Sequence, residues 1–224
     1  MKILSLFLFL SIALGSTSYA QDVYDKIAKQ TCKCFEKEKI PKTEDAGYCM
    51  IKYIAKNIKG LKAFHGLEKE DKLDLQEVSI RLSGKYTKQC AYYNNLLIEE
   101  SKSKIKVYEE DLDVVCPNDL SGNYYYLTPT AGDGDPVKTY VTIEDGVYTE
   151  LLNEGKTYSK LDLKIIDDCT YQLIFDESDD PGKDSMSKKG DTYTYRIIQN
   201  SEYSFVVITK IAFTEFYVEY VRTK

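Results

Sequence analysis

The sequence predicts an α+β protein in which a disulfide-stapled helical domain precedes an antiparallel β-barrel of eight strands. Apolar residues recur three or four positions apart up to about residue 100, which is the period of an α-helix. From Leu120 onward, apolar and polar residues alternate in short runs separated by turn residues, which is typical of β-strands. The expected segments are a signal peptide over 1–20, a helical domain over 21–110, a linker over 111–119 and a barrel over 120–224.

Residues 1–20 have the pattern of a secretory signal peptide. Lys2 supplies a positive charge, residues 3–14 are almost wholly apolar, and Ser18 and Ala20 are small residues at the positions that signal peptidase reads. The apolar stretch is shorter than the about 20 residues that a lasting membrane anchor needs. We therefore expect cleavage after Ala20, export to the periplasm or the extracellular space, and no transmembrane segment in the mature chain.

Three amphipathic helices are predicted between residues 22 and 100. The first must end near Pro41, because proline cannot continue the helical hydrogen-bond ladder. The second begins at Thr43, a good N-cap followed by two acidic residues. The third covers about 70–97, and Gly84 in its middle suggests a kink. Three such helices can bury one small core together.

Eight short segments rich in Tyr, Val, Ile and Thr make up the second half of the chain. In one of them Leu161, Leu163 and Ile165 alternate with charged residues, so one strand face should be buried and the other wet. Such a series favours a closed up-and-down barrel or a sandwich, and closure removes exposed sheet edges. The predicted strands are 122–129, 137–143, 147–152, 157–166, 169–175, 192–199, 203–209 and 213–222.

Charge is divided unevenly along the chain. Residues 21–115 hold 18 Lys and Arg against 17 Asp and Glu, whereas residues 116–224 hold 11 against 19. Contacts to phosphates need clustered Lys and Arg, so the acidic second half argues against nucleic acid as a partner. The chain has 20 Tyr and no Trp, and tyrosine-rich strands suit sheets that are apolar on one side and wet on the other.

The six cysteines favour three structural disulfides in an exported chain. Cys116 and Cys169 lie in the β half and pair by elimination if the halves are separate. Cys32 and Cys34 are two apart on a helix and point in different directions, so they should not pair with each other. Two connectivities then remain for the helical half. The preferred pairs are Cys34–Cys49 and Cys32–Cys90.

The sequence gives little support for redox, zinc or histidine chemistry. Cys32 and Cys34 could act as a redox dithiol, but they fall in mid-helix rather than at an activating helix N-terminus. Paired Cys-x-x-Cys spacing is absent and the sole histidine, His65, is distant in sequence, so no zinc site is expected. His65 is predicted to be exposed in a loop, and no Gly-x-Ser-x-Gly motif occurs. We therefore expect no catalytic residue, no metal and no cofactor.

The densest acidic run, residues 176–182, could offer oxygen ligands to Ca²⁺. It departs from the EF-hand pattern, because Pro181 stands where glycine is required and Ser187 where the final Glu is required. We interpret the run as a solvated hairpin loop. Glu215 and Glu219 are predicted to face solvent, on the strand face opposite Phe216, so they do not form a hydrolytic pair.

The first and last predicted strands carry a matched pair of residues. Gly122-Asn123-Tyr124 lies on the first strand and Arg222 on the last. In this the β half resembles a lipocalin, where an Arg on the last strand stacks on the Trp of a Gly-x-Trp motif, although Tyr replaces Trp here. The resemblance implies a cation–π contact between Tyr124 and Arg222 that closes the barrel.

The whole chain is also similar to small exported proteins of Bacteroidetes that have an N-terminal Cys-x-Cys helical region. This resemblance rests on Thr31-Cys32-Lys33-Cys34, Lys88-Gln89-Cys90 and Asp168-Cys169-Thr170-Tyr171. It implies no function.

The sequence favours an exported, non-enzymatic binding or interaction protein. A lipocalin-like barrel implies a small apolar ligand inside, although a small barrel can equally be filled by its own side chains. Two alternatives remain: a structural envelope protein whose helical half docks a protein partner, and a thiol-disulfide oxidoreductase that uses Cys32 and Cys34. The predicted ligand-binding residues are Tyr124, Leu161, Leu163, Tyr171, Leu173, Phe216 and Tyr220.

Overall fold

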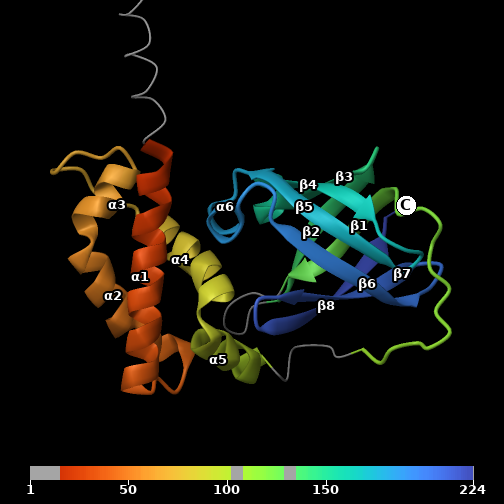
Figure 1. Ribbon diagram of the computed structural model, residues 1–224, viewed down its shortest axis with the longest axis horizontal. Helices are drawn as coiled ribbons and strands as arrows, with labels where there is room; N and C mark the ends of the chain where they lie inside the picture. The colour runs from red at the N-terminus through yellow and green to blue at the C-terminus, as the bar shows by residue number, and fades with distance from the viewer. Residues whose placement is uncertain (1–15, 102–107, 129–134, 224) are drawn as a thin grey trace, which may run out of the picture. The chain divides into compact units, whose positions relative to one another are not determined.

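The computed structural model describes residues 16–101, 108–128 and 135–223, without the side chains of 16–22 and 101. The chain forms two compact units, and the boundary between them along the sequence follows Leu96. The first unit is helical, and the second is a closed antiparallel barrel of eight strands (Figure 1). The predicted α+β class, with helices first and a barrel second, is confirmed. Most of the expected signal peptide lies outside the described residues.

The helical unit is built on α1, which spans Ser16–Glu38. The helix ends at Lys39, which adopts a left-handed conformation with φ of 51°. The amide of Ile40 then donates to the carbonyl of Phe35 at 3.2 Å, a Schellman-type C-cap that satisfies an end carbonyl. The predicted end before Pro41 is therefore found, with the cap supplied by lysine instead of glycine.

The predicted second helix is divided into three pieces: a 3₁₀ turn, η1 (Thr43–Ala46), then α2 (Gly47–Lys56) and α3 (Ile58–Phe64). The break falls at Asn57, whose φ of −113° and ψ of 15° are not helical. The Asn57 side chain donates to the carbonyl of Tyr53 at 2.8 Å and to Gln30 of α1 at 3.2 Å. Asparagine competes with the backbone in this way, so it favours a helix boundary.

The predicted third helix is also two helices, α4 (Leu75–Gln89) and α5 (Ala91–Ser101). Asp74 caps α4 by accepting from the amides of Gln76 and Glu77. Gly84, where the sequence makes a kink possible, lies within continuous α4. The chain breaks instead at Cys90, with φ of −122° and ψ of 89°, the residue that a disulfide ties to α1.

The helical core lies between α1 and the helices packed on it. Phe35, Leu61 and Tyr86 are fully buried there. Gly60 lets α3 approach α1 closely, since a β-carbon at that position would lie 3.0 Å from Val23. Figure 1 shows α1 (red) beside α2 and α3 (orange).

A partly buried ion pair joins α1 to α4. Lys85 contacts Asp25 at 2.7 Å, and the lysine side chain is only 5% exposed. Gln89 donates to the same Asp25 oxygen at 2.7 Å. A lysine this buried needs such a partner, because removing an ammonium group from water is costly unless it is paired.

Three disulfides form, and each of them lies within a single unit. The helical unit has Cys34–Cys49, between α1 and α2, and Cys32–Cys90, between α1 and the end of α4. The barrel unit has Cys116–Cys169. These are the pairs that the sequence analysis preferred. Each typically stabilises a fold by about 2–4 kcal/mol.

The barrel closes in strand order β1 to β8, with β1 paired to β8. Every observed strand overlaps its predicted segment, and the ends differ by three residues at most. Each strand pairs antiparallel with the next along the chain, so short connections suffice throughout. The strands are β1 (Gly122–Thr128), β2 (Val137–Glu144), β3 (Val147–Leu152), β4 (Thr157–Ile165), β5 (Thr170–Ser178), β6 (Thr192–Asn200), β7 (Ser204–Ile211) and β8 (Thr214–Arg222).

The acidic run over 176–182 is not the solvated loop that its composition suggests. Its first three residues belong to β5, and its last two begin a short helix, α6 (Pro181–Met186), with Pro181 in the first helical turn and Asp180 as N-cap. Asp180 is buried and accepts from the amide of Lys183 at 2.9 Å and from Asn153 at 3.0 Å. The hydrogen bonds explain why a carboxylate can be buried there.

The segment before β1 lies along strands of the barrel. The amide of Asp111 donates to the carbonyl of Ile198 at 3.0 Å, and the side chain of Gln199 donates to the carbonyl of Glu109 at 2.7 Å. Arg196 forms a two-point contact with Glu110. Part of the expected linker is thus packed against β6.

Candidate functional site

The interior of the barrel is filled by aromatic side chains. Seven tyrosines belong to or pack against its core, together with Phe175 and Phe205. The cavity that remains there has a volume of about 40 Å³, which is room for a water molecule. Pockets for small organic ligands usually measure roughly 300–1,000 Å³. The tyrosines are Tyr124, Tyr126, Tyr148, Tyr171, Tyr193, Tyr195 and Tyr220.

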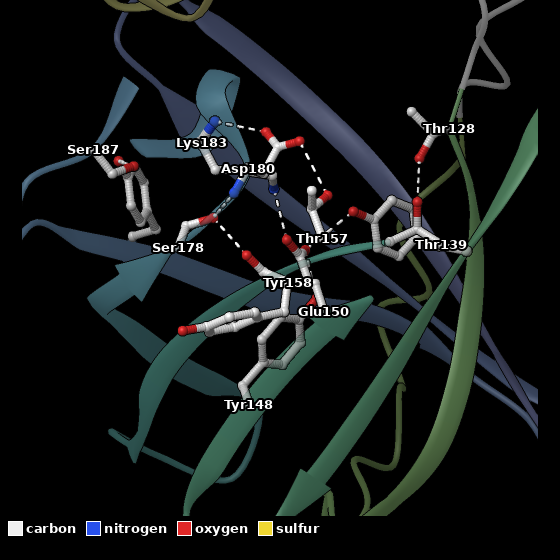
Figure 2. Close-up of polar contacts among 12 residues, drawn as sticks. Thr128, Thr139, Tyr148, Glu150, Thr157, Tyr158, Ser178, Asp180, Lys183 and Ser187 are labelled. Atoms are coloured by element: carbon white, nitrogen blue, oxygen red, sulfur yellow. Dashed lines mark hydrogen bonds and ion pairs between the residues drawn. The ribbon is translucent and has the colours of Figure 1, made fainter. Parts of the chain in front are cut away.

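A carboxylate and an ammonium group meet beside this cavity. Glu150 on β3 contacts Lys183 of α6 at 2.7 Å, with side chains 8% and 29% exposed. Tyr126 and Tyr148 each donate a hydrogen bond of 3.0 Å to the same Glu150 oxygen. The hydroxyl of Tyr148 also lies 3.0 Å from that of Tyr220. Figure 2 shows Glu150 and Lys183 near the capping residue of α6.

Local structure explains how these two charges come together. Strand alternation places Glu150 on the same inward face as Tyr148. Lys183 lies in the first turn of α6, which Asp180 starts by capping its amide. The hydroxyl of Ser187, just after α6, is 2.6 Å from that of Tyr193 on β6. The helix is thus tied to the barrel by a charged contact and a neutral one.

Burial and neighbouring charges favour fixed protonation states in this cluster. Desolvation raises the pKa values of Tyr126, Tyr148 and Tyr195, and the Glu150 carboxylate raises them further. The pKa of Lys183 is also raised: burial opposes the charged form, but the nearby Glu150 outweighs it. These tyrosines stay neutral and Lys183 stays charged across the neutral pH range.

A second polar contact in the barrel joins its first and last strands. Tyr124 and Arg222 are register partners, and the guanidinium carbon lies 5.6 Å from the Tyr124 ring centroid. Arg222 also donates to the Tyr124 hydroxyl at 3.3 Å and lies over Phe205 at 5.8 Å. Gly122 has φ of 143°, and a β-carbon there would lie 3.3 Å from the Tyr124 hydroxyl. The pair expected from the lipocalin resemblance is in contact.

The residues predicted to line a ligand cavity are mostly core residues packed on one another. Phe216 is the exception, because it is 36% exposed, and its assignment to a buried lining is wrong. It pairs in register with Thr209 near the β7–β8 turn, where the two strands end. Tyr124, Leu161, Tyr171, Leu173 and Tyr220 are buried, and Leu163 packs against them. The pocket that borders Leu161 and Leu173 has a volume of about 40 Å³, which is the size of a water site.

The Cys32 and Cys34 side chains belong to two different disulfides. Cys32 is 8% exposed and Cys34 is 4% exposed. Thiol–disulfide exchange requires a thiolate to reach a sulfur atom in line, so burial disfavours it. This arrangement does not supply the exposed dithiol that an oxidoreductase would use.

His65 lies in the turn after α3, as predicted for a loop residue, but the prediction that it is solvent-exposed is wrong. Its side chain is only 14% exposed. The ring Nε2 lies 2.9 Å from the hydroxyl of Tyr24, and Nδ1 lies 3.8 Å from Glu77. The histidine therefore joins α1, α3 and α4, and no nucleophile accompanies it among these contacts.

The described residues contain no group of three or more His, Cys, Asp or Glu side chains that could hold a metal ion. No helix within the described part of the chain is long and apolar enough to cross a membrane. A comparison with protein-family models finds no match, and a comparison with curated proteins finds none either.

Sequence reasoning missed the Glu150–Lys183 pair. Alternation along Tyr148-Thr149-Glu150 could have placed the carboxylate inside, because Tyr148 was on a predicted strand. No local signal marks Lys183, since α6 is only six residues long and lies in a stretch rich in turn formers.

Proposed function

We propose that the protein is an exported, non-enzymatic binding protein whose barrel is a filled scaffold and whose outer surfaces bind the partner. The small volume of the interior cavity, about 40 Å³, is the observation that carries this proposal. A carrier that encloses its ligand needs several times that volume. A filled barrel instead gives a rigid support for side chains outside it.

Export is supported by the disulfides and by the leader-like pattern of residues 1–20. Three disulfides and no free cysteine, among the described residues, suit an oxidising compartment. Protein isolated from its native host should begin at Gln21 and contain no free thiol. N-terminal sequencing and thiol titration under denaturing conditions test both points. An intact Met1 or reduced cysteines would overturn export.

The filled barrel is tested by ligand uptake. Gently purified protein should have the mass of the bare chain in native mass spectrometry and should not take up benzene or indole. Tyr171→Ala would open a cavity among apolar side chains and should allow such uptake, at a cost of about 3–5 kcal/mol. Leu173→Ala is a smaller truncation of the same core, for use if the first variant does not fold. A stoichiometric bound lipid in the unmodified protein would contradict the proposal.

A further inference from the structure

Large apolar side chains are exposed on the outer face of α2. Tyr48 is 65% exposed and Ile51 is 70% exposed. The two residues lie three positions apart and therefore on the same side of the helix. Ala55, one turn further on, is exposed as well. We call this surface, with Lys52 and Lys56 beside it, the α2 face.

The opposite side of α2 is fixed to the unit's core, so these residues cannot turn inward. Cys49 is fully buried and bonded to Cys34 of α1. Ile54 is also buried in the same core. The exposure of Tyr48 and Ile51 is therefore a property of the folded helix.

The surroundings of the α2 face carry a net positive charge. Residues 42–67 contain five lysines against two acidic residues, Glu44 and Asp45, and Glu44 pairs with Lys42. Lys52 lies 5.4 Å from the ring centroid of Tyr48, and Lys56 lies 5.2 Å from that of Tyr53. Lys52, Lys56 and Lys59 form no salt bridge with any residue that the structure describes. This surface is complementary to a partner that is negatively charged and accepts apolar side chains.

We propose that the α2 face binds the surface of an anionic phospholipid membrane. Lysine beside exposed Ile and Tyr is the composition of helices that lie in a membrane interface, where tyrosine is favoured. Lysine also reaches headgroups while its alkyl stem covers apolar surface. Two large side chains on a convex helix are few for a stable protein interface, which buries about 800 Å² on each partner. They suffice for shallow insertion that electrostatic attraction assists.

This inference rests on the proposed function, because it names the partner class of one outer surface. The full-length mature protein should bind vesicles of equal parts phosphatidylglycerol and phosphatidylcholine in a flotation assay, and should bind pure phosphatidylcholine vesicles far less. Lys52→Gln, Lys56→Gln and Lys59→Gln combined should weaken partitioning by about 100-fold, at about 1 kcal/mol for each lysine.

The matched control is Lys26→Gln, Lys29→Gln and Lys33→Gln combined. It removes the same charge from the exposed side of α1, where acidic residues are interspersed and where, over the described side chains of 23–38, no large apolar residue is exposed. Its binding should stay within about threefold of the unmodified protein, because the removed charges lie away from the bilayer contact. Circular dichroism establishes that both variants are folded.

Insertion can be observed directly, because the chain contains no Trp. Tyr48→Trp should show a blue-shifted emission on the anionic vesicles and quenching by brominated lipid. Tyr203→Trp, at a 71% exposed position of the barrel, should show neither. Absence of binding, equal binding to neutral vesicles, or equal losses in the two lysine variants would each overturn the membrane proposal. The filled-barrel proposal would stand in those cases, because ligand uptake tests it separately.

Discussion

At the scale of single residues, one group of buried polar side chains in the tyrosine-rich core of the barrel is paired internally. A buried hydroxyl or charge is tolerated when it is hydrogen-bonded or paired, and is costly otherwise. Glu150 accepts from two tyrosines and contacts Lys183, so one carboxylate satisfies three donors. The guanidinium of Arg222 is likewise partnered, because it lies over the Tyr124 ring. The charged side chains of the barrel therefore depend on the aromatic residues that contact them.

Removing one partner of the Glu150–Lys183 pair should cost more than removing both. Lys183→Met leaves a buried carboxylate uncompensated and should lower the free energy of unfolding by about 3 kcal/mol. Adding Glu150→Gln, which keeps acceptors for the two tyrosines, should recover most of this loss. Urea denaturation measures the double-mutant cycle. Lys156→Met is the control, since its pair with Glu154 is exposed and worth little. Equal effects of Lys156→Met and Lys183→Met would contradict this account.

Gly122 should tolerate no side chain. Its φ of 143° is strained for an L-residue, and a β-carbon would press on the Tyr124 hydroxyl. Gly122→Ala should therefore destabilise the barrel by about 1–3 kcal/mol, measured by thermal unfolding. Gly47→Ala is the comparison, because Gly47 is helical with open space around it and the change should be neutral or stabilising. Similar melting temperatures for the two variants would argue against strain at Gly122.

At the scale of elements, helix caps and helix breaks set the helix boundaries that the spacing of apolar residues does not define. The second predicted helix breaks at Asn57 and the third at Cys90, and the side chains of both residues bond elsewhere in the unit. Apolar spacing continues through both breaks, so the pattern alone cannot reveal them. The same holds for α6, which a buried cap starts within an acidic run.

Asp180 should control the local stability of α6. Asp180→Ala removes the cap and the contacts to Asn153 and Thr157, and should destabilise α6 by about 1–2 kcal/mol. Hydrogen exchange should quicken at the amides of α6 and change little in β6 and β7. Asp74→Ala, which uncaps α4, should cost a similar amount without affecting α6. Unchanged exchange in α6 would refute the role of this cap.

At the scale of the whole molecule, two internally cross-linked units divide the chain, and each has its own core. Both cores contain tyrosines whose pKa values burial raises, including Tyr24 and Tyr86 in the helical unit and Tyr126 and Tyr148 in the barrel. Ionisation of these tyrosines at high pH should therefore lower the free energy of unfolding of both units.

The protein should unfold cooperatively in alkali. A group whose pKa is higher in the folded state contributes stability that is complete below its unfolded pKa, about 10 for tyrosine. This stability falls as pH rises above that value, by about 1.4 kcal/mol per pH unit for each such group. Lys183, whose pKa is also raised in the folded state, contributes stability that is lost in the same direction as pH rises. Tyrosinate absorbance and circular dichroism should change in one transition above about pH 10. Titration of all tyrosines with the fold retained would contradict this.

The sequence by itself determined the two-part layout, the positions of the eight strands and the two connectivities open to the cysteines of the helical half. Strand alternation, turn residues and parity of cysteines are local signals, whereas closure of the sheet and the choice between those connectivities depend on the tertiary structure. Only the tertiary structure decided that the barrel is filled, that Phe216 is exposed and that Glu150 meets Lys183. Cavity volume and buried charge pairs depend on how side chains distant in sequence share space, and no local period records that.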